Sequence, residues 1–108
     1  MTASGDAESG QKIIVHIEAD MEVLVQKYLP ARRRDITTIK EALGKEDFDT
    51  IRLLGHSMKG NGPSYGFDPI GGIGARIEEG ALARVPAEIR DGLDQLGSYL
   101  DRVEVVYE

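Results

Sequence analysis

The 108-residue sequence contains no cysteine and no tryptophan. Without cysteine, the chain has no disulfide framework, no thiolate nucleophile and no cysteine-ligated metal. It also lacks an apolar run approaching the roughly 18 residues that a membrane span needs. The segment from Met1 to Gly10 has neither the positive start nor the apolar centre of a signal peptide. These absences predict a soluble, cytoplasmic protein.

Positive charge is scarce as well, since 13 lysine and arginine residues are outnumbered by 19 aspartate and glutamate residues, which gives a net charge of -6. Phosphate backbones are held mainly by lysine and arginine, so this balance argues against a general nucleic-acid binder. The single basic run, Arg32 to Arg34, fits a solvated helix face better than a binding patch. A P-loop and a kinase glycine loop are both missing, so we do not expect the chain to phosphorylate itself from ATP.

The overall composition, with 41% hydrophobic and 30% charged residues, is ordinary for one globular domain. Residues 1–11 are small and polar without periodicity, which is typical of a disordered or loosely held tail. Residues 12–108 show no internal repeat and no linker. We therefore expect one domain over residues 12–108.

The first predicted helix follows Asp20, a plausible N-cap, and its apolar residues recur at i, i+3, i+4 and i+7 up to Tyr28. Pro30 either ends this helix or occupies the first turn of a second helix that runs to about Leu43. A single kinked helix from Asp20 to Leu43 is the alternative.

Three more helices follow at short intervals. A third helix begins at Asp47 or the residue before it, and the Asp68-Pro69 pair opens a fourth that should end near Arg84. Pro86 opens a fifth helix, which has the strongest apolar periodicity in the chain. Together these elements predict an all-α fold, an antiparallel four-helix bundle with an accessory N-terminal helix.

Two short segments at the ends of the predicted domain are rich in β-branched residues. Residues 12–17 fit a strand of about five residues, and Val103 to Tyr107 is similar. The two segments are candidates for pairing with each other, because chain termini often lie close together and an isolated strand edge is a liability. The competing interpretation is that Val103 to Val106 continues the last helix. His16, in the first segment, is interpreted as structural.

The other histidine, His56, lies about 140° from the apolar stripe of the third helix and should face solvent. Lys59 and Gly60 share its face. Helical side chains lean toward the N-terminus, so the residue four positions later would normally cover the imidazole, and here that residue is Gly60. A glycine inside a helix costs up to about 1 kcal/mol relative to alanine. We interpret Gly60 and Gly62 as removing side chains that would shield the ring from a partner.

An exposed imidazole beside a cation suits a phosphate carrier. With an ordinary pKa of about 6.5, imidazole is largely neutral at cytoplasmic pH and has a ring nitrogen free to attack. Lys59 would help to neutralise the phosphoryl charge, because two unit charges about 4 Å apart interact by roughly 1 kcal/mol in water and about 4 kcal/mol near a protein surface. Since the sequence shows no nucleotide site, the phosphate must come from a partner.

The run His56-Ser57-Met58-Lys59-Gly60 resembles the H-x-x-K-G signature of histidine phosphotransfer (HPt) domains, and the likeness extends from about Asp20 to Leu100. The resemblance implies that His56 accepts a phosphoryl group on Nε2 from the aspartyl phosphate of a response-regulator receiver domain, in a two-component phosphorelay, and passes it to another receiver. It implies that Lys59 assists the phosphoryl group and that Gly60 gives access.

The same resemblance bears on cofactors and partners. It implies that Mg²⁺ is held by the partner receiver domain and that this chain binds no cofactor. A histidine kinase is a further expected partner, and we expect the chain itself to be a monomer. One departure from the family pattern is Pro63, where many members have a small residue. This proline is expected to affect the local geometry of the helix just past the site.

Four neighbours of His56 are candidate docking residues for the partner. Leu53 and Pro63 are apolar and would form a small patch that a receiver covers. Arg52 would contact the partner or lie on a solvated face. Asn61, like Ser57, would hydrogen-bond near the phosphoryl group or face water.

Two other functions remain open from the sequence. The first is a non-catalytic interaction module that uses the face around His56 to dock a receiver domain or a partner helix without phosphotransfer. The second is a metal-binding bundle, in which Glu78 and Glu79 would be the metal ligands. The sequence contains no Glu-x-x-His pair, so a di-metal site is not favoured.

Overall fold

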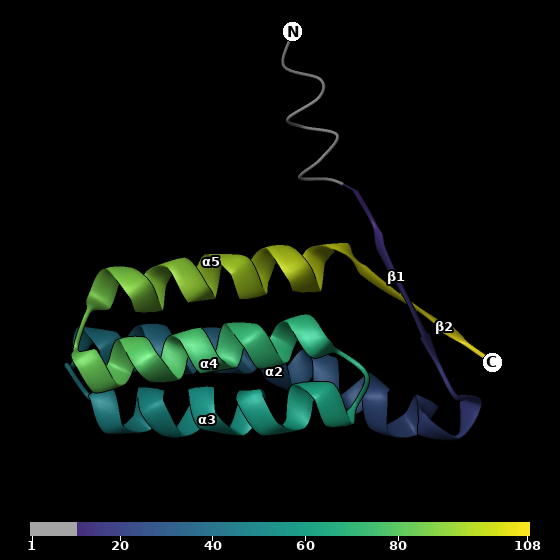
Figure 1. The fold of residues 1–108 in the computed structure, drawn as a ribbon, viewed down its shortest axis with the longest axis horizontal. Helices are drawn as coiled ribbons and strands as arrows, with labels where there is room; N and C mark the ends of the chain where they lie inside the picture. The colour runs from purple at the N-terminus through teal and green to yellow at the C-terminus, as the bar shows by residue number, and fades with distance from the viewer. Residues whose placement is uncertain (1–10) are drawn as a thin grey trace, which may run out of the picture.

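The computed structural model describes residues 11–108, in which four helices run side by side and a small sheet projects from one end (Figure 1). This architecture confirms the predicted all-α bundle. The predicted tail falls almost entirely on residues 1–10, which lie outside the described residues. In chain order the elements are β1 (Ile13–Ile17), the short 3₁₀ helix η1 (Ala19–Met21), α2 (Glu22–Gly44), α3 (Phe48–Ser64), α4 (Asp68–Ala83), α5 (Pro86–Arg102) and β2 (Val103–Tyr107).

The first long helix, α2, is continuous over 23 residues and contains Pro30 in its interior. The accessory N-terminal helix is therefore wrong as a separate element, and the single-helix alternative is the one that forms. Proline cannot donate to the carbonyl of Gln26, but both residues are exposed, so water can satisfy that carbonyl. Asp20 does not cap α2 either, because it lies within η1 and the N-cap position is Met21.

The other helix boundaries agree with the sequence. Asp47 caps α3, since its Oδ1 accepts a hydrogen bond from the Thr50 backbone N–H at 3.2 Å and its Oδ2 accepts from the Thr50 hydroxyl at 2.6 Å. Pro69 lies in the first turn of α4, and Arg84 ends that helix in the left-handed conformation with φ 56°. Pro86 begins α5.

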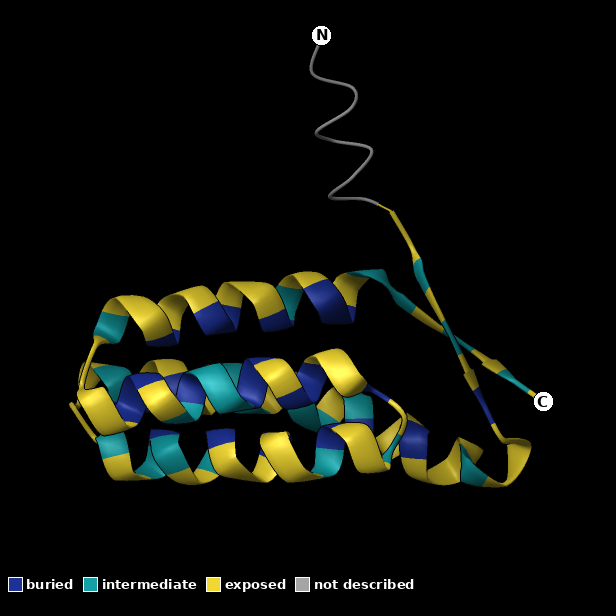
Figure 2. Cartoon of the chain, in the orientation of Figure 1, coloured by how far each residue is buried: buried dark blue, intermediate teal, exposed yellow. Residues whose placement is uncertain are grey.

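The core lies between the four helices, and each helix turns one buried stripe toward it (Figure 2). Fully burying one such aliphatic side chain contributes about 1.5–3 kcal/mol. The largest fully buried side chains come from all four helices and from the α3–α4 connection: Val25, Ile39, Ile51, Met58, Phe67, Ile70, Ile77, Ile89 and Leu96.

Glycines allow the backbones of α3 and α4 to touch. A Cβ atom on Gly55 would lie 2.7 Å from the backbone nitrogen of Glu78, and one on Gly62 would lie 2.6 Å from the backbone nitrogen of Gly71. Such distances leave no room for a side chain. The interpretation that Gly62 exposes the imidazole is therefore wrong, because Gly62 is buried against α4 and serves helix packing.

The two strands pair in parallel, from Ile13 opposite Val103 to Ile17 opposite Tyr107. The predicted pairing of the chain ends is confirmed, and the continuation of the last helix through Val106 is wrong. Strand pairing follows from the bundle, because α2 begins and α5 ends at the same end of it (Figure 1). Apolar side chains of one sheet face, including buried Ile17, pack against the core.

Within the described part of the chain, every helix is too short or too polar to cross a membrane.

Candidate functional site

His56 lies in the middle of α3 with its side chain 66% exposed, while Ile51 and Met58 of the same helix are fully buried. The imidazole therefore points away from the core, as predicted. A ring in this position is open to solvent on a rigid helix.

Among residues 11–108, the imidazole has one partner, the carboxylate of Glu78 on α4. His56 Nδ1 lies 2.9 Å from Glu78 Oε2. An ionised carboxylate only accepts hydrogen bonds, so the proton of a neutral imidazole is on Nδ1. The other ring nitrogen, Nε2, then keeps its lone pair, which makes it the nucleophilic atom of the ring.

Glu78 also contacts the lysine of the predicted signature. Lys59 Nζ lies 3.6 Å from Glu78 Oε1, and the Glu78 side chain is only 14% exposed. The hydrogen bond from His56, aided by the charges of His56 and Lys59, holds the pKa of Glu78 below its usual range. Glu78 is therefore ionised at neutral pH, as the Nδ1–H tautomer of His56 requires.

The glycine contact between α3 and α4 explains how Glu78 reaches the histidine. Gly55 precedes His56 directly, and its missing side chain lets α3 approach the backbone of Glu78. The sequence suggests Glu78 as a possible metal ligand and does not place it beside His56. Its pairing with His56, 22 residues away, depends on how the two helices are aligned, and periodicity within one helix does not report that alignment.

Gly60 lies beside this group and differs from the packing glycines. A Cβ atom placed on Gly60 would have nothing within 4 Å. The position is exposed, so the absence of a side chain leaves free space over the ring instead of bringing two helices together. This geometry suits the access role expected of Gly60.

The four candidate docking residues divide into two groups. Leu53 is 55% exposed and Pro63 is exposed, and helical spacing places both on the face of His56. Arg52 is half-buried on the same face. Asn61 is turned toward α2, where its Oδ1 accepts a hydrogen bond from the Tyr28 hydroxyl at 2.5 Å.

The sequence also raises the effect of Pro63 on α3 and the possibility of a metal site. Helix α3 continues through Pro63 to Ser64, so this proline does not break the helix. No group of three or more histidine, cysteine, aspartate or glutamate side chains in residues 11–108 is arranged to hold a metal ion.

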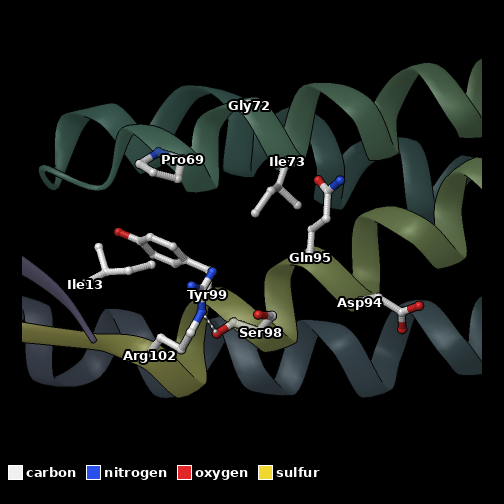
Figure 3. Close-up of a pocket in the computed structure, with 9 residues that line it drawn as sticks. All are labelled: Ile13, Pro69, Gly72, Ile73, Asp94, Gln95, Ser98, Tyr99 and Arg102. Carbon is white, nitrogen blue, oxygen red and sulfur yellow. Dashed lines mark hydrogen bonds between the residues drawn. The ribbon is translucent and has the colours of Figure 1, made fainter. Parts of the chain in front are cut away.

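A cavity of about 640 Å³ lies elsewhere, between α4 and α5 beside the start of β1 (Figure 3). Pro69, Ile73 and Tyr99 contribute to its lining, and it does not include His56. The Tyr99 hydroxyl is buried without a hydrogen-bond partner among the described residues. Burial, with a smaller effect of the Asp68 charge, raises the pKa of Tyr99. The phenol thus stays neutral at ordinary pH, so Tyr99 does not supply a phenolate nucleophile to this cavity.

Comparison with known proteins agrees with the geometry. A family model described as the Hpt domain matches residues 23–105, which include His56, Lys59 and Glu78. No significant match was found among curated proteins or solved structures. Hpt domains act in histidine phosphotransfer in phosphorelays, where they interact with receiver domains and kinases. Because the match covers well over half of the sequence, this chain belongs to the Hpt domain family.

Proposed function

We propose that this protein is a cytoplasmic phosphocarrier in which His56 accepts a phosphoryl group from the aspartyl phosphate of one response-regulator receiver domain and passes it to another. The observation that carries the proposal is the contact of His56 Nδ1 with Glu78, which leaves Nε2 as the free nitrogen of a side chain that is 66% exposed. A nucleophile held in one tautomer on a rigid helix needs little reorganisation before it reacts.

The transfer step uses the lone pair of Nε2. That pair forms a P–N bond while the P–O bond to the receiver's aspartate breaks, and the aspartate leaves as a carboxylate with the bonding electrons. Nδ1 keeps its proton, so the phosphorylated ring is a cation. The ionised carboxylate of Glu78, 2.9 Å from Nδ1, balances that charge. Reversal of the same step delivers the group to the next receiver.

Lys59 supports the step from the same helix face. The Lys59 side chain is 56% exposed and its ammonium group already lies beside Glu78, within reach of a phosphoryl group on the imidazole. The lysine contributes charge and not base catalysis, because its ammonium has no lone pair. Mg²⁺ belongs to the receiver in this proposal, and the chain's own residues supply the nucleophile, its orientation and one cation.

The receiver would dock on the face around His56. Leu53 and Pro63 offer exposed apolar surface, Arg52 offers a cation, and Gly60 leaves the ring uncovered. Asn61 contributes to this surface indirectly, since its side chain ties α3 to Tyr28 of α2. A histidine kinase is a second partner for the same face.

Incubation with a phosphorylated receiver domain tests the proposal. Wild-type protein should gain a label that is labile in acid and stable in alkali, as expected for phosphohistidine. The variant His56→Gln should gain none, whereas His16→Gln, which removes the chain's other histidine, should be labelled like wild type. Label that survives His56→Gln would remove His56 from the acceptor role.

A docking module without phosphotransfer is the second candidate, favoured by the exposed apolar side chains beside His56. It predicts that wild type and His56→Gln bind a receiver with equal affinity and that neither acquires label. Binding measured by calorimetry alongside the labelling experiment separates the two functions.

A further inference from the structure

The sheet at the end of the bundle has two unpaired edges. No backbone hydrogen bond joins β1 or β2 to a third segment within residues 11–108. A two-stranded sheet is marginally stable in water, and an open edge is a template for another strand. The side of this small sheet that faces away from the core also carries exposed apolar residues, with Ile14 50% and Val106 39% exposed.

We propose that β1 pairs with β1 of a second copy of this chain, which would give a weak symmetric dimer with a four-stranded sheet. Two identical strands related by a two-fold axis must run antiparallel, and such a contact closes on itself. Pairing over the full length of Ile13–Ile17 places the axis at Val15. In this alignment Ile14 lies opposite the partner's His16, and Ile13 lies opposite the partner's Ile17.

Charge supports this alignment. One residue beyond each strand, Lys12 would face Glu18 of the partner, and the two-fold axis creates this pair twice. Lys12 now contacts Glu104 of its own sheet at 2.9 Å, while Glu18 forms no ion pair within the described part of the chain. The dimer would therefore give Glu18 a partner of opposite charge.

The edge of β2 is less suitable for the same contact. Full antiparallel pairing of two β2 strands would place the axis at Val105 and bring the two Glu104 side chains into diagonal contact, where like charges repel. The corresponding diagonal contact along β1 joins the two Ile14 side chains. Between its ends, β1 contains only apolar residues and His16, so it lacks a charged residue equivalent to Glu104, the one charged residue of β2.

The sequence predicts a monomer. The small area of the proposed contact means that the dimer should be weak, so the chain would be largely monomeric at low concentration. Stable interfaces bury about 1,200–2,000 Å², whereas two five-residue strands bury less, so we expect association on the order of 100 µM. Phosphotransfer at His56 does not depend on this contact, because the sheet edge and the imidazole belong to different elements.

Sedimentation velocity on the full chain, from 10 µM to 1 mM, tests the proposal. The wild-type mass should rise toward twice the monomer value across this range. Ile14→Lys should raise the dimer dissociation constant at least tenfold, and the matched variant Val106→Lys, on the same sheet face but on β2, should leave it near the wild-type value. A wild-type chain that stays monomeric at 1 mM, or an Ile14→Lys chain that dimerises normally, overturns the proposal.

A charge exchange tests the alignment of the strands. Lys12→Glu and Glu18→Lys should each weaken the dimer, and the double variant should restore it, because each dimer again contains two opposite-charge pairs. Thermal melting of all variants confirms that they fold. If the double variant associates no better than the single variants, the Val15-centred pairing is wrong.

Discussion

In the proposed transfer, Glu78 orients His56 and keeps its proton on Nδ1, although it takes no part in bond formation. Its replacement by alanine would free the ring to rotate and let the proton occupy either nitrogen. Carboxylates that orient a metal-bound histidine typically affect metal affinity or activity by about 10–100-fold when removed, and we take the same magnitude for Glu78. We expect Glu78→Ala to slow single-turnover transfer from a phosphorylated receiver by about that factor, and Glu78→Gln to slow it less, since the amide oxygen still accepts from Nδ1–H.

The neighbouring Glu79 supplies the control for this prediction. It is exposed on the same helix and contacts neither His56 nor Lys59 in the structure, so Glu79→Ala should transfer at the wild-type rate. Imidazole ¹⁵N spectra provide a second measurement, with the Nδ1–H tautomer dominant in wild type and a mixture in Glu78→Ala. Unchanged rate and unchanged tautomer in Glu78→Ala would show that Glu78 does not position the ring.

Asp47 is a second single residue with a measurable charge effect. Hydrogen bonds from the Thr50 side chain and backbone hold the pKa of Asp47 below its usual range. A lowered folded-state pKa means that the ionised form stabilises the fold above the unfolded pKa of about 3.9, and that this stabilisation is lost as pH falls through the lower folded pKa. The Tm of wild type should exceed that of Asp47→Asn at pH 7, and the difference should vanish in acid. A difference that is constant with pH would contradict this.

At the scale of helices, the glycines of α3 have opposite roles that stability measurements can separate. A Cβ atom on Gly55 would lie 2.8 Å from the carbonyl oxygen of Gly74, and backbone cannot move aside cheaply. We expect Gly55→Ala to destabilise the fold by about 1–3 kcal/mol. Gly60→Ala meets nothing within 4 Å and should stabilise it by about 0.5–1 kcal/mol through helix propensity. Urea unfolding of both variants checks the contrast, which a loss of stability in Gly60→Ala would refute.

Access to the ring is a separate property of Gly60. A leucine at this position would lean over His56 without clashing with the fold. Gly60→Leu should slow transfer from a receiver at least tenfold, yet label at the wild-type rate with phosphoramidate, a donor small enough to pass the side chain. Gly72→Leu is the control, because Gly72 on α4 is also exposed and unobstructed. Equal transfer rates in Gly60→Leu and wild type would show that a receiver does not need the open space at Gly60, even if His56 is the acceptor.

How far the sequence predicts these elements depends on whether the signal lies within one segment. Caps and apolar spacing define α3, α4 and α5, and β-branched runs define both strands, because each signal is local. Pro30 is ambiguous for the opposite reason, since its effect depends on whether water can reach the Gln26 carbonyl. The function of each glycine, and the pairing of Glu78 with His56, depend on how α3 lies against α4. That alignment is set by the packing of two helices and is not encoded in either one alone.

In the whole molecule, the sheet and the group around His56 are separate structural units. The sheet joins the start of α2 to the end of α5, and the ladder continues beyond β1, where Ala19 N–H donates to the carbonyl of Glu108 at 3.0 Å. His56, Lys59 and Glu78 lie on α3 and α4, which are held together by their own glycine contacts. Weakening the sheet should therefore lower the stability of the fold without changing the chemistry at His56.

Adjacent residues of β2 provide a matched test of this separation. Val105 is half-buried on the face that packs against the core, whereas Val106 is 39% exposed on the opposite face. Threonine has the shape of valine but adds a hydroxyl that loses hydrogen bonds when buried. Val105→Thr should lower the free energy of unfolding by about 1 kcal/mol and Val106→Thr by much less. Below the unfolding transition, both variants should acquire phosphate from phosphoramidate at the wild-type rate, because neither residue touches α3 or α4 at the site. A slower rate in folded Val105→Thr would show that the sheet and the imidazole are coupled through the bundle.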